Sequence, residues 1–469
     1  MIAILFFWGI RGRTCFINTR RALTNNPAVG YNPKIQTSHI LMLDSNYLYG
    51  KGMMLPLPYS DFRDENPAPF SVERIKALNP DAERGYLFVV NLGISAHAHD
   101  ELNDYPIAPS KLEINEEIIS PYSKTLRELL DLPEKFSSVK LAPNLLDKER
   151  YITALPNLQF YISKGAIVTE VLRVVSFVQK AWMRPYIEKL TECRRSATTE
   201  SEKYRYKISS NACFGKFIQN VRDYEETKII RTPADHKLQA CKPEFKGFTI
   251  FDENLASIHL REKVTILDRP VYAGWAILES SKLEMYKAWY EVIRVKWPSA
   301  RLLFTDTDSF LMQVFTDTLV DDLRDISDHL DLSNIPPDHP LYSDVNKFVP
   351  GKFKSEVENN DIREFIGLRS KMYSMTIVGE KGEKKKNTAA GTKKAVAKKL
   401  QHEQYREVLE NMTKMMSNQK HFRSKGHEMY LININKTSLS CYDDKRYLLQ
   451  ESHESYAYGH VQIEFNHAK

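Results

Sequence analysis

The sequence has little of what marks several large classes of protein. Its cysteines are few and include no C-x-x-C pair, which argues against structural zinc and a disulfide framework and favours a reducing, intracellular compartment. They are scattered over the chain as Cys15, Cys193, Cys213, Cys241 and Cys441. No apolar run approaches the length of a membrane span, so no membrane association is expected. The net charge of +6 over 469 residues is too small to indicate nucleic-acid binding by itself.

Apolar runs are the main structural signal in the sequence. The chain is too long for one simple core, and roughly two to four subdomains are expected. Residues 1–8 lack the basic region and cleavage site of a signal peptide and are interpreted as a buried strand or as a ragged start of the gene. Further strands are predicted at 38–43, 86–92, 302–304 and 310–315.

Helical periodicity dominates two other regions. Valines at three- and four-residue intervals predict helix through 166–222, kinked or divided at Pro185. Residues 395–416 also predict helix, and a strand-rich tail follows at 428–462. Residues 223–262 carry turn-like breaks that suit an inserted element. Strands interrupted by helical insertions indicate an α+β fold.

Two carboxylates stand at the bend of a predicted hairpin. Asp306 and Asp308 lie between the apolar runs 302–304 and 310–312, and in extended backbone their side chains point to the same side. Such a pair repels, which makes most sense around divalent cations. A calcium loop is excluded, because its fifth and sixth positions need an oxygen ligand and a glycine but hold phenylalanine and leucine.

Asp44 is a candidate third carboxylate, since it follows the apolar run 40–43 directly. A lone Asp after a strand is usually a turn or helix N-cap residue. The functional interpretation is that it joins Asp306 and Asp308 to hold two metal ions for phosphoryl transfer. One ion then lowers the pKa of the attacking hydroxyl and the other stabilises the leaving oxygen. Neither the segment with Asp44 nor the hairpin with Asp306 and Asp308 establishes a metal site by itself.

Lys207, Asn211 and Phe214 recur at helical spacing and therefore share one helix face. A cation, an amide and an aromatic ring, followed by Gly215, suit a nucleotide. The lysine would meet phosphate, the ring would shape the base pocket, and the glycine would allow close backbone approach. The alternative is a solvated basic helix face with Phe214 in the core.

A third basic region follows the hairpin. In extended form Arg369, Lys371 and Tyr373 share a face, which suits phosphate contact near a primer end, although an ordinary surface strand fits the spacing equally. Residues 381–399 then hold eight lysines against one acid, Glu383. Such a stretch is typical of a solvated or disordered face as well as of contact with a duplex backbone.

These segments, in this order, resemble the motifs of family B DNA polymerases. Residues 44–50 are similar to D-x-x-S-L-Y-P, 207–215 to K-x-x-x-N-S-x-Y-G, 304–309 to Y-x-D-T-D-S, and 371–373 to K-x-Y. The closer resemblance is to the protein-primed branch of phages, linear plasmids, viruses and self-synthesising transposons. Stretches of that branch are matched at 351–356, 367–374, 443–447 and 458–460, so the likeness runs from about 11 to 460.

The resemblance implies a two-metal site for Mg²⁺, which Mn²⁺ can replace. Asp44 and Asp308 would be the main ligands of both ions, Asp306 would support them, and the carbonyl of Ser45 or Asn46 would add a ligand.

The resemblance also assigns roles in substrate binding. Tyr49 would pack under the sugar and exclude a 2′-hydroxyl, Arg195 and Lys207 would hold the triphosphate of a dNTP, and Asn211 and Phe214 would shape the nascent base pair. Residues that would contact the primer terminus or DNA are Lys354, Arg369, Lys371 and Tyr373.

The same resemblance implies that the chain would be a right-hand polymerase acting as a monomer on template-primer DNA. A hydroxyl on a priming protein would be one possible initial primer, and the expected location is intracellular, in the nucleus or at an organelle or viral replication site. The expected parts are a palm at 1–84 and 263–375, a first insertion at 85–165, fingers at 166–222, a second insertion at 223–262 and a thumb at 376–469. In that branch the insertions contact the priming protein and encircle DNA.

The sequence departs from the family pattern at several points. In the first motif Tyr47 replaces a small polar residue and Gly50 replaces proline, and in the second Ala212 and Phe214 replace Ser and Tyr. Only ten residues precede Arg11, where the family places a linker after a 3′–5′ exonuclease, so a polymerase module without proofreading is expected. A catalytically silent DNA-binding remnant is the alternative. A reverse transcriptase is disfavoured, because that class keeps its two carboxylates adjacent.

Overall fold

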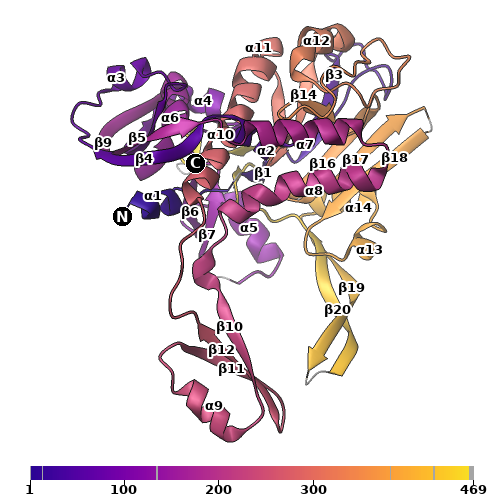
Figure 1. Ribbon diagram of the computed structural model, residues 1–469. Helices are drawn as coiled ribbons and strands as arrows, with labels where there is room; N and C mark the ends of the chain where they lie inside the picture. The colour runs from indigo at the N-terminus through magenta and orange to yellow at the C-terminus, as the bar shows by residue number, and fades with distance from the viewer. Residues whose placement is uncertain (1, 13, 134–135, 381, 426–427, 464–469) are drawn as a thin grey trace.

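The structure is a computed structural model that describes residues 2–12, 14–133, 136–380, 382–425 and 428–463 (Figure 1). Arg13, the last residue of the linker predicted at 11–13, and Lys381, the first residue of the lysine-rich stretch, lie outside the described residues. Within the described part of the chain, no helix is long and apolar enough to cross a membrane.

A five-stranded antiparallel sheet brings together segments that lie far apart in the sequence. Its order is β1–β13–β14–β3–β15. The strands are β1 (Cys15–Ile17), β3 (Ser38–Ser45), β13 (Arg301–Asp306), β14 (Ser309–Phe315) and β15 (Phe353–Ser355). Six of the seven residues of β14 are buried, as expected of a central strand covered on both faces. The predicted strands in this sheet are confirmed, and the pairing places Asp44 opposite Ser309.

Helix α10 (Val271–Lys287) lies at the heart of the molecule and continues through a π-helical segment, 288–293, into α11 (Arg294–Lys296). Its buried Trp275 meets Phe6 of α1 (Ile2–Trp8) with the ring centroids 5.2 Å apart. The strand predicted at residues 1–8 is therefore wrong, because this run is a helix packed on α10. A short apolar run fits a buried helix as well as a strand.

A second sheet, of order β4–β9–β5–β8, carries helix α6 (Leu155–Ser163). Its strands are β4 (Leu57–Glu65), β5 (Arg84–Ile94), β8 (Lys148–Ala154) and β9 (Ala166–Lys180). Strand β5 confirms the strand predicted at 86–92. Strand β9 contradicts the helix predicted over the first part of 166–222, since its valines pair with β5, as β-branched residues favour extended backbone.

The helical part of that region starts later. Helix α7 (Arg184–Ser196) has Pro185 in its first turn, where the missing N–H is not needed. Helix α8 (Glu200–Phe217) follows it and is capped by Thr199, whose hydroxyl accepts from the N–H of Glu202. In Figure 1 these two helices lie side by side across the front of the molecule.

A third sheet, of order β18–β17–β16–β2, contains much of the lysine-rich stretch. Its strands are β2 (Arg21–Leu23), β16 (Asp361–Arg369), β17 (Met372–Gly379) and β18 (Gly382–Ala389). The described lysines of the stretch up to Lys386 thus belong to a paired strand and not to a disordered face.

The helix predicted at 395–416 is only partly present. It is divided into α13 (Lys394–Ala397) and α14 (His402–Glu410), and β19 (Lys414–Lys425) begins where the prediction still expected helix. Met412 has a left-handed φ of 53°, which ends the helical path before the strand.

Two elements project from the body in the same direction in Figure 1. One is a three-stranded sheet with a helix, built from β10 (Glu225–Ile230), α9 (Pro233–Ala240), β11 (Phe245–Asp252) and β12 (Leu255–Arg261). The other is the hairpin of β19 with β20 (Glu428–Ser440). Strand β20 begins the predicted strand-rich tail.

The remaining elements are short and border the larger sheets. The helices are α2 (Leu48–Met54), α3 (Val72–Ala77), α4 (His99–Leu102), α5 (Pro121–Leu129) and α12 (Leu319–Asp325). The strands are β6 (Ser110–Ile114), β7 (Ser138–Ala142), β21 (Tyr447–Leu448) and β22 (Ser455–Tyr456).

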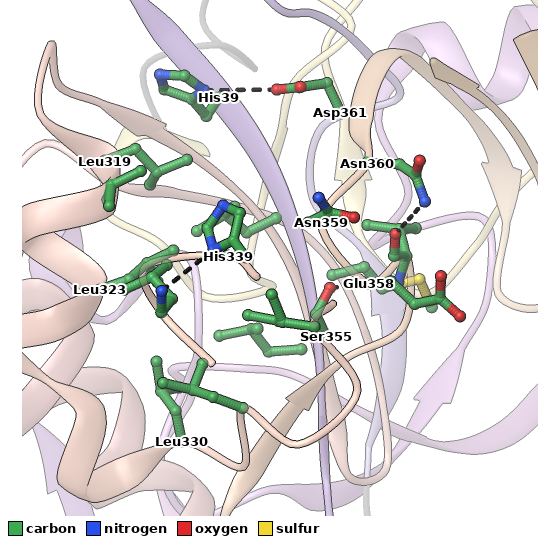
Figure 2. A pocket seen from close by; sticks show the side chains of 18 of the residues that line it. His39, Leu319, Leu323, Leu330, His339, Ser355, Glu358, Asn359, Asn360 and Asp361 are labelled. Carbon is green, nitrogen blue, oxygen red and sulfur yellow. Dashed lines mark hydrogen bonds and ion pairs between the residues drawn. The ribbon is translucent and has the colours of Figure 1, made fainter. Parts of the chain in front are cut away.

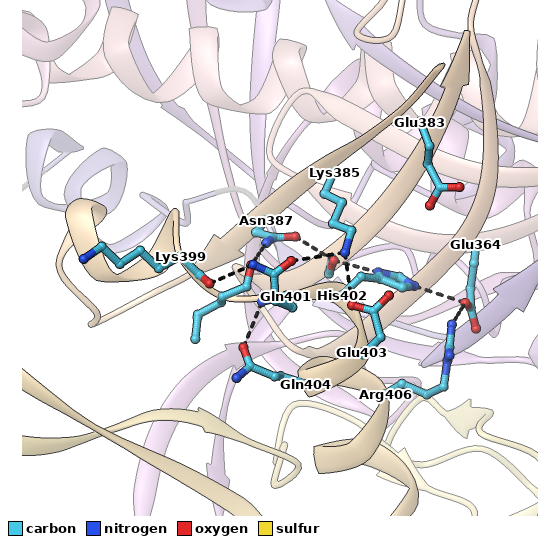
Figure 3. Close-up of polar contacts among 12 residues, drawn as sticks. Glu364, Glu383, Lys385, Asn387, Lys399, Gln401, His402, Glu403, Gln404 and Arg406 are labelled. Carbon is cyan, nitrogen blue, oxygen red and sulfur yellow. Dashed lines mark hydrogen bonds and ion pairs between the residues drawn. The ribbon is translucent and has the colours of Figure 1, made fainter. Parts of the chain in front are cut away.

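A buried carboxylate joins α14 to the third sheet. Glu364 of β16 accepts from Arg21 of β2 at 2.9 Å. It also accepts from His402 at 3.1 Å and from Arg406 (Figure 3). Burial by itself would raise the pKa of Glu364, but the hydrogen bonds from His402 and Arg406 outweigh it and lower that pKa to about 2.

Replacing this carboxylate should destabilise the fold. We expect Glu364→Gln to lower the free energy of unfolding at pH 7 by about 1–3 kcal/mol in urea titrations, because the charged partners lose the negative charge and one of its two acceptor oxygens. Because the folded pKa of Glu364 is depressed, its charged form stabilises the fold fully above pH 4.5, and this contribution is lost as pH falls toward 2. The difference in free energy of unfolding between Glu364→Gln and the unmodified chain should therefore shrink over that range. Glu383→Gln, at an exposed pair with Arg363, is the control. Equal effects of both variants would contradict the expectation.

Candidate active site

The hairpin between β13 and β14 turns within two residues. Thr307 has a left-handed φ of 71°, and its N–H donates to the carbonyl of Thr14 at 3.2 Å. The N–H of Asp308 donates back to the carbonyl of Asp306 at 2.7 Å. Asp306 and Asp308 thus flank a tight turn. The sequence-based prediction placed both instead in one extended strand, with their side chains on the same side. The turn gives each carboxylate its own neighbours.

Asp44 and Asp308 come together across β3 and β14. The N–H of Ser45 donates to the carbonyl of Asp308 at 2.7 Å, which ties the two strand ends. The pKa of Asp44 is raised to about 7, first by burial and then by the negative charges of Asp308 and Glu356; Lys207 and Lys386 oppose the shift. Two carboxylates from distant parts of the sequence therefore share one partly buried place.

Asp306 faces a different partner. Its Oδ2 lies 3.2 Å from Nζ of Lys371, which sits with a left-handed φ of 59° in the turn between β16 and β17. Burial would lower the pKa of Lys371, but the charge of Asp306 outweighs it and raises that pKa. Because the chain turns at Lys371, the predicted extended face of Arg369, Lys371 and Tyr373 is wrong. Tyr373 is instead buried, with its ring 4.9 Å from that of Phe304.

A cavity of about 450 Å³, here called the α8 cavity, lies between the end of β3 and helices α7 and α8. The predicted face of α8 lines it: Lys207 and Asn211 are exposed, and Phe214 is buried. The ring of Tyr49 stacks on that of Phe214 at 4.0 Å with an interplanar angle of 15°. Asp44, Ser45 and Asp308 form another wall. The α8 cavity has the size and the mixed apolar and cationic lining that suit a nucleotide.

A second cavity of about 360 Å³, the hairpin cavity, adjoins the same carboxylates. Asp44 and Asp308 line it as well, so they border both cavities. The hairpin cavity also receives Asp306, Lys371 and Tyr373. The structure therefore collects nine of the predicted site residues around two adjoining spaces, with Ser45 as a tenth.

Three predicted residues are absent from the described lining of both cavities. Arg195 donates to the carbonyl of Lys347 at 3.0 Å and is exposed. Arg369 ends β16. Lys354 pairs with Asp44 between β15 and β3, but its Nζ lies 5.7 Å from the ring of Phe348.

The donor atoms beside Asp44 suit a hard divalent cation. Asp44 and Asp308 offer carboxylate oxygens, and the buried Oγ of Ser45 has no hydrogen-bond partner among the described residues. Within the same part of the chain, no three His, Cys, Asp or Glu side chains converge as a ready-made metal site. Mg²⁺ does not need one, since it commonly binds one or two carboxylates and fills its other positions with water and substrate phosphates.

Comparison by sequence finds no matching family model and no matching curated protein. Comparison by structure finds Phi29 DNA polymerase complexed with primer-template DNA and incoming nucleotide substrates, with a TM-score of 0.53 and 14% identity over 93% of this chain and 62% of that chain. Its binary complex with primer-template DNA gives 0.52 and 14% over the same shares. Its orthorhombic crystal form gives 0.53 and 13%, over 93% and 63%.

The chain has the fold of Phi29 DNA polymerase over most of its length. The predicted α+β polymerase fold is thereby confirmed, while the domain boundaries drawn on the sequence stay a prediction. The chain spans about three fifths of the Phi29 chain. At 13–14% identity the likeness establishes the fold, and activity must be argued from the site.

Two cations at the cavities were not predicted as site residues. Arg194 lines the α8 cavity in place of its neighbour Arg195, with its guanidinium 4.6 Å from the centre of the Phe348 ring. Helical phase could have found it, because Leu190, Thr191 and Arg194 share one face of α7. Lys386 reaches the hairpin cavity from β18 and lies 3.1 Å from Glu356. No local pattern indicates which lysine of the stretch reaches this cavity.

A larger cavity, of about 560 Å³, lies elsewhere, between β3, α12 and the segment after it (Figure 2). Leu319, Leu323 and Leu330 contribute to its apolar lining, and His39 pairs with Asp361 at its edge, 3.8 Å apart. Its described lining includes none of the predicted site residues. Size alone therefore does not identify the site in this molecule.

The raised pKa of Asp44 predicts a pH dependence of stability without metal. The pKa of Asp44 is about 7 in the folded chain and 3.8 in the unfolded chain. Its protonated form therefore stabilises the fold fully below pH 3.8, and this contribution is lost as pH rises through 7. Asp44→Asn should therefore gain stability relative to the unmodified chain between pH 4 and 8, by at most about 4 kcal/mol. Urea unfolding in chelator measures this. Asp344→Asn, at an exposed carboxylate, is the control, and parallel curves for all three chains would contradict the prediction.

Proposed function

We propose that the chain is a template-directed DNA polymerase, which adds dNTPs to a primer 3′-hydroxyl with release of pyrophosphate. The observation that carries the proposal is that Asp44 and Asp308 border two cavities at once. A nucleotidyl transfer brings two reactants to one point, and groups placed between two spaces can act on both. The Phi29 structures with primer-template DNA and incoming nucleotides support the proposal through the common fold.

The α8 cavity would take the incoming nucleotide. Lys207 and Arg194 line it from two helices and would bind the phosphates through charge-assisted hydrogen bonds. The stacked rings of Tyr49 and Phe214 form an apolar surface for the sugar and base, and Asn211 adds an amide beside them. A close aromatic stack beneath the sugar leaves little room for a 2′-hydroxyl, which favours deoxynucleotides.

Asp44 and Asp308 would hold Mg²⁺, with Ser45 beside them and Asp306 in support. Bound Mg²⁺ would lower the pKa of the attacking hydroxyl and stabilise charge on the leaving oxygen. The chain's own contribution is to keep the two carboxylates together, and cations close by reduce their repulsion: Lys207 and Lys386 both lower the pKa of Asp44.

The hairpin cavity would take the primer terminus. Lys371, held by Asp306, offers a cation at its wall, and Tyr373 is fixed by its packing on Phe304. A positioned cation can bind a backbone phosphate and so orient the terminal sugar. Arg369 and Lys354 would contact DNA further from the reacting atoms.

The projecting hairpin of β19 and β20 would contact the duplex. Its exposed cations suit a phosphate backbone and include Lys420, Arg423, Lys425 and Lys436. Initiation on a protein hydroxyl, as in the branch that the motifs resemble, belongs to the same proposal. The second candidate function is DNA binding without catalysis, which the basic hairpin by itself also allows.

Extension of a primed DNA template with Mg²⁺ and dNTPs tests the proposal. The unmodified chain should extend the primer, and Asp308→Asn should do so at least about a hundredfold more slowly, since a lost metal ligand removes several kcal/mol of charge stabilisation. Asp317→Asn, at an exposed carboxylate beyond β14, should stay within about twofold. Retention of DNA without extension by the unmodified chain would favour the binding remnant.

The two adjacent arginines of α7 give a matched pair of variants. Because Arg194 lines the α8 cavity and Arg195 does not, Arg194→Ala should raise KM for dNTP about tenfold, the weight of one charge-assisted hydrogen bond. Arg195→Ala should change KM less than about twofold. Steady-state extension at varied dNTP concentration measures both. The reverse order would restore the sequence-based assignment of Arg195.

A further inference from the structure

Tyr47 stands in an unusual backbone conformation at the edge of the α8 cavity. It precedes α2 with a left-handed φ of 40°, which bulky residues rarely adopt. Such a conformation persists only where the surroundings hold it. The contacts of Tyr47 identify what holds it.

The hydroxyl of Tyr47 reaches helix α8. It donates to the carbonyl of Ser210 at 2.6 Å, and Ser210 is itself buried. A helix carbonyl has two lone pairs and can accept this bond in addition to its own helical one. The bond thus joins the end of β3 to the middle of α8.

The ring of Tyr47 fills space that only glycine leaves open at position 50. A Cβ on Gly50 would lie 2.1 Å from both Cδ1 and Cε1 of the Tyr47 ring. The two departures from the first motif, Tyr47 and Gly50, are therefore complementary in shape. Either one without the other would lose the packing.

The bond lies between two functional positions of α8. Lys207 is three residues before Ser210 and Phe214 is four residues after it, and all three line the α8 cavity. Fixing the carbonyl of Ser210 fixes the stretch of helix that carries the cation and the ring. Phe214 is also the residue on which Tyr49 stacks.

We propose that Tyr47 is a positioning residue, which through Ser210 holds α8 against the end of β3 and so keeps Lys207 and Phe214 in place for the nucleotide. Gly50 is the residue that makes room for it. The inference rests on the proposed polymerase function for its effect on nucleotide binding, while the link itself is a property of the fold.

Tyr47→Phe removes the hydroxyl and keeps the ring. We expect KM for dNTP to rise about five- to tenfold, kcat to stay within about twofold, and the Kd for primer-template DNA to stay unchanged, because the lost interaction acts on nucleotide binding. Tyr204→Phe is the matched control, since Tyr204 is on the same helix with 65% of its surface exposed. An unchanged KM, or a fall in kcat alone, would overturn the inference.

Two measurements without activity separate this inference from the proposed function. Hydrogen exchange of α8 peptides over 207–214 should be faster in Tyr47→Phe than in the unmodified chain or in Tyr204→Phe. Gly50→Ala should lower the midpoint of thermal unfolding strongly in the chain that keeps Tyr47. The same substitution should lower it little in a chain that already carries Tyr47→Ser. Equal exchange, or equal losses in both backgrounds, overturns the inference even if the chain extends DNA. A chain that extends no primer but keeps both effects would refute only the polymerase proposal.

Discussion

The antiparallel pairing of β3 with β14 is the constraint on which the rest of the site depends. It sets Leu43 against Phe310, both buried, and so places Asp44 opposite Ser309 at the start of β14. A slip of one residue would turn Asp44 to the other face of the sheet and bury a polar neighbour in its place. Apolar burial along two strands therefore fixes the position of a charged pair at their ends.

The pair of Asp44 and Asp308 is electrostatically unfavourable by itself, and the surrounding elements supply positive charges that offset the repulsion. Burial and Asp308 both raise the pKa of Asp44, while Lys207 from α8 and Lys386 from β18 oppose the rise. Lys371 from the β16–β17 turn neutralises Asp306 in the same way. The cations come from three elements that share no sheet with Asp44, so the electrostatics of the site are complete only when the sheets and α8 have assembled.

Local patterns predicted the parts of this arrangement that depend on local physics. The β13–β14 hairpin and the Lys207, Asn211 and Phe214 face follow from apolar runs and helical phase, and the structure has both. Strand β9 was predicted as helix, because the spacing of its valines fits the helical period as well as the strand period. Only its pairing with β5 decides between helix and strand.

Other features depend on contacts that no single segment contains. The choice of Arg194 over Arg195 depends on how α7 is rotated against α8, and the turn at Lys371 depends on where β16 ends. Lys386 is one lysine among several in its stretch until β18 pairs with β17 and turns it toward Glu356. Long-range packing, and not residue type, selects these side chains.

A shared fold at 13–14% identity leaves function to the arrangement of the site. Either cavity alone would be ambiguous, since a cationic helix face binds many anions and a paired carboxylate turn binds many cations. Transfer of a nucleotide requires more, because the two reacting atoms must approach to about 3–3.5 Å in the right orientation. Asp44 and Asp308 are the side chains that reach both spaces together with Lys207 on one side and Lys371 on the other. The joint position of these four groups, and not any one motif, is what favours polymerase chemistry over simple binding of DNA.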